Sequence, residues 1–440
     1  MQILFKYYVI EISKYLITFF MFLYTALAVT CIFSRKEKVV SICSSVQSGL
    51  LLVLMFLCFL DMTFVSEKEL YLYLFAFITL FLFFMITIVS IIYDKADRIL
   101  LNNMCLLSGI GLCMVSRLSF NKAFRQYIIT LISFAICLAI PFFIDRFKYF
   151  KQLIWVYPVV GIIALLIVLL AGRKVNGANI TFTIKGLSFQ PSEFVKILFL
   201  FFLAALLYKY NSFKWILISA VIAGIHVIIL VLSRDLGSAL IFFVAYVMIV
   251  VMATHDYRYL LAGLLGGALA CIAAYNIFDH VKVRVMAFTS PWKYIDDQAY
   301  QVTQSLFAIS SGGWTGCGLM QGRPWDIPFV DQDLVFSAIC EEMGLLFAIC
   351  LLIICICSFA RMMLLAVDIG DKFYQIMVYG IGIMYIFQVF LTVGGGTKFI
   401  PLTGVTLPLI SYGGSSVMTT YFMFFIVQGI VIKSRNYEGK

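Results

Sequence analysis

The sequence predicts an all-α fold, a polytopic transmembrane helix bundle. Of its 440 residues, 63% are hydrophobic and only 12% are charged, whereas roughly 25% of residues are charged in soluble domains. Apolar runs long enough to span hydrocarbon, about 20 residues each, recur along the whole chain. The first run is too long, and too quickly followed by others, for a cleaved signal peptide. We therefore expect an integral membrane protein.

About thirteen spans are expected from the lengths of these runs. They lie near residues 11–33, 39–60, 69–93, 100–116, 124–144, 152–171, 191–208, 214–233, 236–253, 259–278, 333–358, 373–394 and 405–432. The first three carry almost no polar motif, and we assign residues 1–96 to additional N-terminal spans. Polar residues recur at regular places from Asp97 onward, and residues 97–440 are assigned to the transmembrane core.

One connector, residues 279–332, is much longer than the others. Loops of this length are usually functional or disordered. This one carries Trp292, Trp314 and Trp325 among charges and glycines. Because Trp and Tyr prefer the membrane interface, we expect the loop to fold against the bundle.

Composition also excludes several function classes. The net charge is +10, but Lys and Arg are scattered among connectors, which indicates contact with lipid headgroups and not with nucleic acid. The 12 Cys show no paired spacing, and the 3 His lie in or beside different spans. We therefore predict no protein metal centre. A Gly-x4-Gly-Lys-Ser/Thr motif is absent, so ATP hydrolysis is not indicated.

The segment Pro401–Ser416 is the most unusual part of the chain, because glycines, prolines and hydroxyls crowd the start of an apolar run. Irregular backbone at membrane depth is tolerated only where it is buried in protein or lines a cavity. The segment, with Ser415 and Ser416 at its end, therefore indicates a shaped polar site.

Glu193 and Lys196 open another span, three residues apart. This spacing places both heads on one helical face, where they can pair. Ionisable residues within spans mark a site or pathway by default, although a structural ion pair between helices would look the same. Asp235, in Ser233-Arg-Asp-Leu-Gly-Ser-Ala239, starts the span near 236–253 and fits either a site residue or a helix N-cap.

Asp333 ends the long loop, and Asp333, Ser337 and Glu341 recur every four residues. This spacing predicts a polar stripe that enters the membrane along one helical face. A partly desolvated carboxylate at a membrane mouth can have a raised pKa and act as a general base. A solvated capping Asp is the alternative.

Further candidates lie around the loop. Gln301 and Gln304 precede Gly312, Gly313, Gly316 and Gly318, and such glycines allow backbone to approach a ligand closely. The same residues serve in tight turns. Arg284, Lys293 and Lys398 are positioned to meet a phosphate or a lipid headgroup.

Taken together, these segments resemble the SEDS family (shape, elongation, division and sporulation), which includes FtsW, RodA and SpoVE. Four blocks carry the resemblance, which covers about residues 97–433. They are Gly177-Ala178 with Phe189-Gln-Pro-Ser-Glu193 and Lys196; Arg234-Asp-Leu-Gly-Ser-Ala239; Arg284 through Gln301, Gln304 and Gly312-Gly313 to Asp333 and Glu341-Glu342; and Gly395-Gly396 with Pro401 to Ser416. Thr181, Lys185, Asp331 and Gln332 depart from the common pattern, and the three leading spans exceed a ten-span layout.

The resemblance implies a peptidoglycan glycosyltransferase that uses lipid II, the undecaprenyl-pyrophosphate disaccharide-pentapeptide. Asp333 would deprotonate the acceptor hydroxyl. The residues Glu193, Lys196, Asp235, Arg284, Gln301, Gln304, Lys398, Ser415 and Ser416 would contribute to substrate binding. Cationic groups or Mg²⁺ would offset the pyrophosphate charge. No organic cofactor is implied.

The family also implies a partner and an orientation. The partner is a class B penicillin-binding transpeptidase. The loop 279–332 would face outside the bacterial cytoplasmic membrane, so the C-terminus is expected in the cytoplasm and the N-terminus outside. Two other functions remain open, a lipid II flippase and a non-catalytic scaffold for the transpeptidase. A flippase would depend more on Glu193 and Lys196 than on Asp333.

Overall fold

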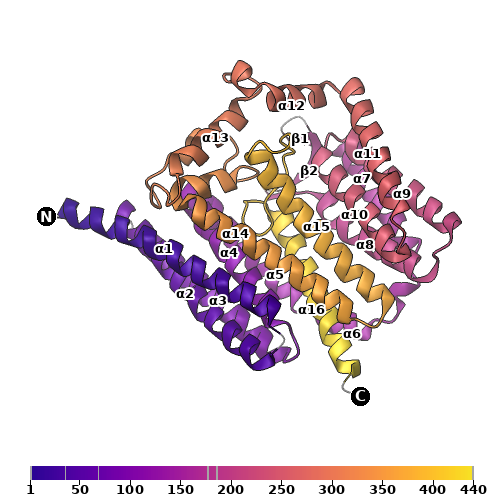
Figure 1. Ribbon diagram of the computed structural model, residues 1–440, viewed down its shortest axis with the longest axis horizontal. Helices are drawn as coiled ribbons and strands as arrows, with labels where there is room; N and C mark the ends of the chain where they lie inside the picture. Colours follow the sequence, from indigo (N-terminus) through magenta and orange to yellow (C-terminus); the bar gives the residue numbers. More distant parts are fainter. Residues whose placement is uncertain (1, 35, 68, 176–177, 185–186, 439–440) are drawn as a thin grey trace. The chain divides into compact units, whose positions relative to one another are not determined.

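The computed structural model describes residues 2–34, 36–67, 69–175, 178–184 and 187–438. Among these residues, 12 helices are long and apolar enough to cross a membrane, and Val156–Ala171 is a shorter apolar helix. Each of the predicted apolar runs overlaps one of these helices (Figure 1). The helical membrane fold is therefore confirmed, whereas the exact number of crossings stays a prediction.

The chain divides into two compact units. Unit 1 comprises residues 1–134, 286–361 and 392–413, and unit 2 comprises residues 135–285, 362–391 and 414–440. Each unit is the part of the chain whose residues mainly contact one another. The assignment of residues 1–96 and 97–440 to separate parts stays a prediction.

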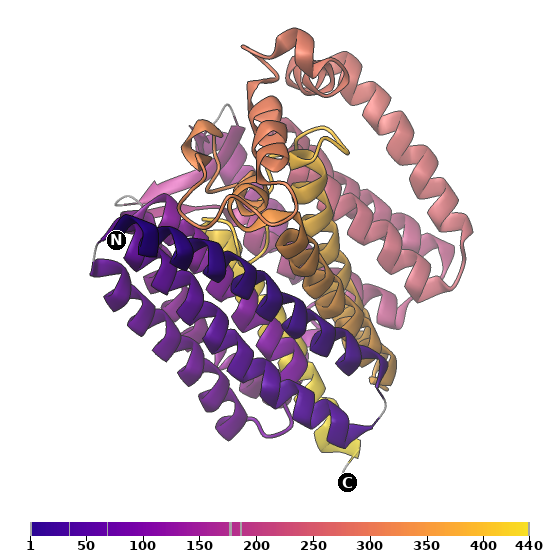
Figure 2. The same cartoon turned by 60° about the vertical axis from the view of Figure 1, so that its left-hand side comes forward.

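Unit 1 begins with α1 (Gln2–Phe33), α2 (Glu37–Ser66), α3 (Leu70–Ile92) and α4 (Arg98–Leu118). Helix α2 packs on α1 and α3, and α2 and α3 both pack on α4; Figure 2 shows the first three as neighbouring rods. Tyr24 donates a hydrogen bond to Asn103 at 3.2 Å, and Asn103 donates one to Ser358 at 3.2 Å. The N-terminal helices are thus tied to α4 by buried polar contacts as well as by apolar packing.

The remaining elements of unit 1 are η2 (Pro291–Tyr294), α13 (Tyr300–Gly312), η3 (Pro324–Asp326) and most of α5 (Phe120–Cys137) and α14 (Val335–Asp368). The predicted long loop, residues 279–332, therefore contains helical segments. Its placement outside the membrane stays a prediction.

Unit 2 contains α6 (Ile140–Arg146), η1 (Tyr149–Lys151), α7 (Val156–Ala171), α8 (Pro191–Lys209), α9 (Phe213–Leu232), α10 (Leu236–Thr254) and α11 (Arg258–Ile277). It also holds most of α12 (Asp279–Thr289) and α15 (Lys372–Gly396), and α16 (Gly414–Glu438). Helix α8 packs against α7, α9, α10 and α16. This central position explains why so much of α8 is buried.

A small antiparallel sheet joins α7 to α8, in the order β1 (Arg173–Val175), β2 (Ala178–Ile184) and β3 (Leu187–Phe189). Thr181 pairs with Arg173, and Phe182 pairs with Phe189. The sequence analysis did not predict these strands. Gly177 and Lys185, which it singled out, lie outside the described residues.

The last predicted span begins later than expected. Residues 397–413 are irregular, and α16 starts at Gly414 instead of near residue 405. Three backbones have positive φ in this segment, at Lys398, Gly404 and Leu409, and prolines at 401 and 408 cannot donate a backbone hydrogen bond. Both features prevent a helix, so the irregular backbone predicted from Pro401–Ser416 is present up to residue 413.

Candidate functional site

Asp333 lies in a turn that precedes α14. Its side chain is half-buried, and the helix begins two residues later, at Val335. The predicted stripe is therefore only partly correct, because Asp333 is outside the helix while Ser337 and Glu341 are buried on it. The Oγ atoms of Ser337 and Ser305 are 2.5 Å apart, which connects α14 to α13.

The two residues before Asp333 are fixed by contacts from distant parts of unit 1. Lys122 Nζ on α5 lies 2.6 Å from Asp331 Oδ2. The backbone N–H of Tyr412 donates to the Asp331 carbonyl at 2.6 Å, and Ser411 Oγ donates to the Gln332 carbonyl. The irregular segment before α16 therefore holds the turn that carries Asp333.

Gln126 completes this arrangement. Its Nε2 donates to the Ser411 carbonyl at 2.9 Å, and its Oε1 accepts from the Gly413 N–H at 3.2 Å. Gln126 and Lys122 are four residues apart, so one face of α5 carries both. Ser411 and Tyr412 lie in the segment singled out from the sequence, whereas Lys122 and Gln126 were missed. The only available signal was a charged and an amide side chain close to the start of an apolar run.

Glycines of the long loop bring backbones together in unit 1. Gly316 and Gly344 both have positive φ, and a side chain at either would meet the other segment's backbone at less than 3 Å. The N–H groups of Cys317 and Gly318 donate to the carbonyls of Glu341 and Glu342. The loop thus pairs with α14 where Gly344 interrupts its helical geometry. Close approach of backbone occurs here, and approach to a ligand stays a prediction.

Two adjacent carboxylates hold the same loop from α14. Glu342 forms a buried ion pair with Arg117 of α4, with 2.8 Å between Oε1 and a guanidinium nitrogen. Glu342 also accepts from the Gly322 N–H at 3.2 Å, and Glu341 accepts from the Arg323 N–H at 2.8 Å. The predicted Glu341-Glu342 motif therefore anchors the loop.

Other predicted residues of unit 1 are distributed around this region. Gln301 and Gln304 are half-buried on α13, and Lys398 is half-buried in the irregular segment. Ser305, next to Gln304, donates to the Gly396 carbonyl at 2.6 Å. The beginning of the irregular segment is thereby attached to α13. The roles of Gln301, Gln304 and Lys398 stay predictions.

In unit 2, Glu193 and Lys196 form the predicted pair. Pro191 opens α8, and the carboxylate lies in its first turn. Lys196 is fully buried, with Nζ 2.9 Å from Glu193 Oε2 and 2.9 Å from Gln388 Oε1. Glu193 Oε2 has no hydrogen-bond partner among the described residues, so its contact with Lys196 is a charge contact without hydrogen-bond alignment.

Asp235 is the N-cap of α10. This was one of the two roles that the sequence allowed for it, the other being a site residue. Its Oδ1 accepts from the Ser238 N–H at 3.1 Å. Its Oδ2 accepts from Gln190 Nε2 and from Ser192 Oγ, both at 3.3 Å. One carboxylate thus caps α10 and fixes the start of α8.

The two serines at the start of α16 join these groups, Ser415 the one around Asp235 and Ser416 the one around Lys196. Ser415 Oγ accepts from the Gln190 N–H at 2.9 Å, and Ser416 Oγ accepts from Gln388 Nε2 at 3.5 Å. Unit 2 therefore brings together five predicted residues, namely Glu193, Lys196, Asp235, Ser415 and Ser416. Gln190, Ser192 and Gln388 complete these groups, and of these the sequence analysis missed Gln388.

Arg284 lies on α12, one turn after His280. Burial lowers the pKa of His280 below its ordinary value, and the positive charges of Arg234 and Arg284 lower it further, while Asp279 raises it. Arg284 thus belongs to a cationic group at the beginning of α12. Its contact with substrate stays a prediction.

A protein metal centre was not predicted. Among the described residues, His, Cys, Asp and Glu form no group of three or more that could hold a metal ion. Mg²⁺ often binds through one or two carboxylates together with substrate phosphates. A divalent cation that binds with a phosphorylated substrate stays a prediction.

The chain matches the family model described as cell cycle protein, FTSW_RODA_SPOVE, over residues 98–436. It is 32% identical over 363 residues to the peptidoglycan glycosyltransferase RodA of Mycobacterium tuberculosis H37Rv, covering 76% of this chain and 77% of that one. It is 27% identical over 410 residues to a probable peptidoglycan glycosyltransferase FtsW of Neisseria gonorrhoeae, covering 79% and 86%.

Solved structures agree with these relatives. A chain of a peptidoglycan synthase complex, described as coordinating polymerization and crosslinking, is similar with a TM-score of 0.66 and 25% identity, covering 78% of this chain and 99% of that one. The rod shape determining protein RodA of Thermus thermophilus shares the fold, with a TM-score of 0.60 and 24% identity over 77% of this chain and 97% of that one. The chain therefore belongs to the FtsW, RodA and SpoVE family of cell cycle proteins.

Proposed function

We propose that this multi-pass membrane protein is a peptidoglycan glycosyltransferase that polymerises lipid II into glycan strands. The observation that carries the proposal is the half-buried Asp333 in a turn held by Lys122 and by residues 411 and 412. Family membership supports the reaction class.

Asp333 acts as the general base in this proposal. It removes the proton from the acceptor's sugar hydroxyl as that oxygen attacks the anomeric carbon of the growing chain. The bond from this carbon to the lipid pyrophosphate breaks at the same time, and the electron pair leaves with the pyrophosphate. A single displacement of this kind inverts the anomeric configuration.

The polar groups of unit 2 have the composition of a site for the polar part of a lipid substrate. Ionisable residues within spans are costly and mark sites by default, and Lys196 is fully buried between Glu193 and Gln388. Arg284 adds positive charge near the start of α12. We assign these groups to the lipid-linked sugar and its pyrophosphate. A divalent cation bound to the pyrophosphate supplies further positive charge.

The partner in this proposal is a class B penicillin-binding transpeptidase, which crosslinks the strands that this chain makes. The related chain from a peptidoglycan synthase complex supports such an assembly. Residues 279–332 face the outside of the cytoplasmic membrane, the C-terminus faces the cytoplasm, and the N-terminus lies outside.

Cys317 offers a direct test of this orientation. It is exposed in the long loop, although partial loss of solvent around the thiol, and the nearby Glu341 and Glu342, raise the pKa of that thiol. Labelling above pH 8 compensates for the raised pKa, because the thiolate is the reactive form. A membrane-impermeant maleimide should label intact cells, and Cys317→Ala should remove that signal. Labelling that requires broken cells would reverse the orientation.

The activity is tested with purified protein and purified lipid II, with and without the transpeptidase. Wild type should make glycan strands, while Asp333→Ala and Asp333→Asn should make none and should retain the wild-type unfolding temperature. Asp326→Asn, in the same loop, is the matched control. Strands from Asp333→Ala would exclude this base. Scrambling of lipid II in liposomes that depends on Glu193, without strands from any preparation, would favour a flippase.

A further inference from the structure

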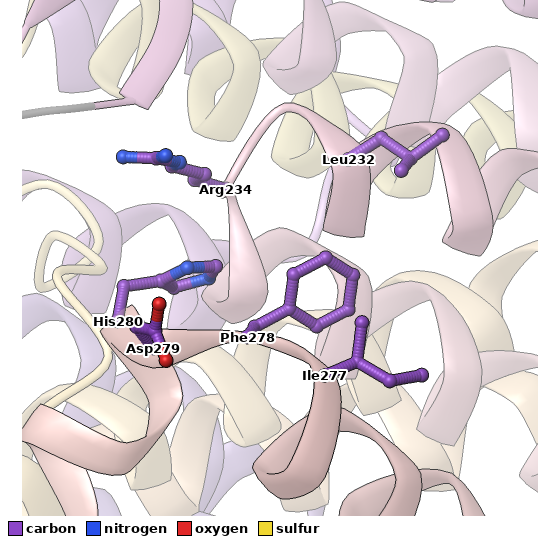
Figure 3. A pocket seen from close by; sticks show the side chains of 6 residues that line it. All are labelled: Leu232, Arg234, Ile277, Phe278, Asp279 and His280. Atoms are coloured by element: carbon purple, nitrogen blue, oxygen red, sulfur yellow. The ribbon is translucent and has the colours of Figure 1, made fainter.

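A cavity of about 360 Å³ lies in unit 2 where α9 ends and α12 begins. Its lining consists of Leu232, Arg234, Ile277, Phe278, Asp279 and His280. Figure 3 shows the three apolar side chains on one side and Arg234, Asp279 and His280 on the other. The cavity is therefore amphipathic, with a hydrocarbon wall facing a polar wall.

The polar wall, taken together with the charged residues that act on it from beside, carries excess positive charge. Arg234 is part of it, and the charge of Arg284 also acts on His280. The carboxylate in the lining, Asp279, is already paired with Lys282, with 3.0 Å between Oδ1 and Nζ. Three cationic side chains thus stand against one carboxylate, and this balance favours an anionic ligand.

The Nε2 atom of His280 is placed to bind a ligand. This atom is buried and has no hydrogen-bond partner among the described residues. A buried polar atom without a partner costs free energy, which a ligand oxygen can recover. Arg234 and His280 line the same cavity, and the charge of Arg234 acts on His280, so one ligand group can reach both.

Arg234 is held in a conformation that non-glycine residues seldom adopt. Its φ is 64°, and its N–H donates to the Val231 carbonyl at 3.0 Å while the next N–H donates to Leu230 at 2.9 Å. Strained backbone of this kind persists where the surrounding structure imposes it, often at ligand sites. The end of α9 thus fixes the position from which Arg234 extends.

The apolar wall points to a lipid as the source of the anion. Leu232 is 53% exposed and Ile277 is 68% exposed, and both end membrane-spanning helices. Helix α11, which ends at Ile277, has no buried residue. Hydrocarbon chains of the membrane can therefore reach this wall, whereas a small soluble anion would leave it unused.

We propose that this cavity binds the phosphate group of a membrane lipid. Arg234 and His280 donate to phosphate oxygens, and Leu232, Ile277 and Phe278 contact the start of the hydrocarbon chain. A glycerophospholipid and a polyprenyl phosphate share this chemistry; the second source rests on the proposed function, and the first does not.

The test is native mass spectrometry of the purified full chain in detergent, titrated separately with phosphatidylglycerol, undecaprenyl phosphate and phosphate-free diacylglycerol. The first two lipids distinguish the sources. Arg234→Met and His280→Phe cannot donate to phosphate, and each should lower the apparent affinity for the bound lipid by about tenfold, the effect expected of one lost hydrogen bond to a charged group. Lys214→Gln, at the opposite end of α9, is the matched control.

Selective binding of either phosphate lipid that is weakened by both cavity variants, but not by Lys214→Gln, supports the site. Equal binding by wild type and the cavity variants overturns it, and so does diacylglycerol binding of the same strength. His280→Phe decides the question if Arg234→Met does not fold. Because binding is measured without polymerisation, a failure of the proposed enzyme activity leaves this result unaffected.

Discussion

Lys122 and Asp331 form an ion pair with 2.6 Å between Nζ and Oδ2, two residues before Asp333. The Asp331 side chain is nearly buried, while that of Lys122 is 45% exposed. Such a half-exposed pair contributes little to stability, about 0–1 kcal/mol. The ion pair matters for the position of Asp333 and not for stability, because it holds the backbone of the turn that carries this proposed base.

We predict that Lys122→Met and Asp331→Asn each lower kcat of lipid II polymerisation by about ten- to hundredfold, as misplacement of a catalytic group does. KM should change little, and the unfolding temperature should stay close to that of wild type. The exchanged pair, Lys122→Asp with Asp331→Lys, should recover part of kcat. Steady-state kinetics of the three variants and of wild type provide the test. If the kcat of the double variant is no higher than that of either single variant, the pair does not position the turn.

The sequence could predict contacts that are local and could not predict those that join distant segments. Glu193 and Lys196 are one helical turn apart, and Asp235 caps a helix that starts at the next residue, so spacing alone indicated both. Lys122 and Asp331 are 209 residues apart, and no periodicity relates them. Their pairing depends on how α5 packs in unit 1, which only the structure supplies.

The loop glycines are a second case in which the sequence could not predict a contact between distant segments. Sequence reasoning could identify that Gly316 allows close approach, because glycine lacks a side chain. It could not identify what approaches. The structure shows the backbone near Gly344, within α14, where a continuous helix was expected. The short sheet before α8 was missed although its middle strand, Ala178–Ile184, alternates apolar and polar residues in the pattern typical of a strand.

For the buried pair in α8, we predict that structure and activity respond differently. Glu193→Gln or Lys196→Met alone leaves one buried charge uncompensated, which should lower the free energy of unfolding by about 3–5 kcal/mol. Combining the two removes both charges and should restore most of that stability. Activity should remain lost in the combined variant if these charges bind substrate. Thermal unfolding in detergent and polymerisation assays measure the two effects, and full activity of the stable double variant would assign the pair a structural role.

Asp235 allows its capping role to be separated from its charge. Asn is as good an N-cap as Asp, whereas Ala typically costs about 1 kcal/mol. We therefore expect Asp235→Asn to keep wild-type stability and Asp235→Ala to lose about that amount. If the negative charge also serves the substrate site, both variants should lose polymerisation equally. Wild-type activity of Asp235→Asn would show that the residue acts through the cap and its contacts to Gln190 and Ser192.

Removal of divalent cations should affect the reaction and not the fold. Because no group of three or more candidate ligands occurs among the described residues, EDTA should leave the unfolding temperature of the substrate-free protein unchanged. Polymerisation should stop and return on addition of Mg²⁺, which binds pyrophosphate readily with few protein ligands. A lower unfolding temperature in EDTA would indicate a resident metal ion instead, and undiminished polymerisation would remove the cation from the proposal.

The buried pair of Arg117 and Glu342 should control how firmly the long loop is held. Arg117 also donates to the Gly322 carbonyl at 3.3 Å and lies over the Trp325 ring, 4.3 Å from its centre. Arg117→Met should therefore destabilise the protein by about 3–5 kcal/mol, because Glu342 is left buried and unpaired. Arg117→Lys should rescue only partly, since an ammonium cannot reproduce the guanidinium's planar set of donors.

Hydrogen exchange locates the effect of this change. The amides of Cys317, Gly318, Gly322 and Arg323 donate to Glu341 and Glu342 of α14. They should exchange faster in Arg117→Met than in wild type, because their opening no longer requires a buried ion pair to break. Arg125→Met, which alters an exposed arginine of α5, should leave both exchange and stability unchanged. If exchange in Arg117→Met rises uniformly across unit 1 instead, the pair stabilises the whole unit and does not specifically anchor the loop.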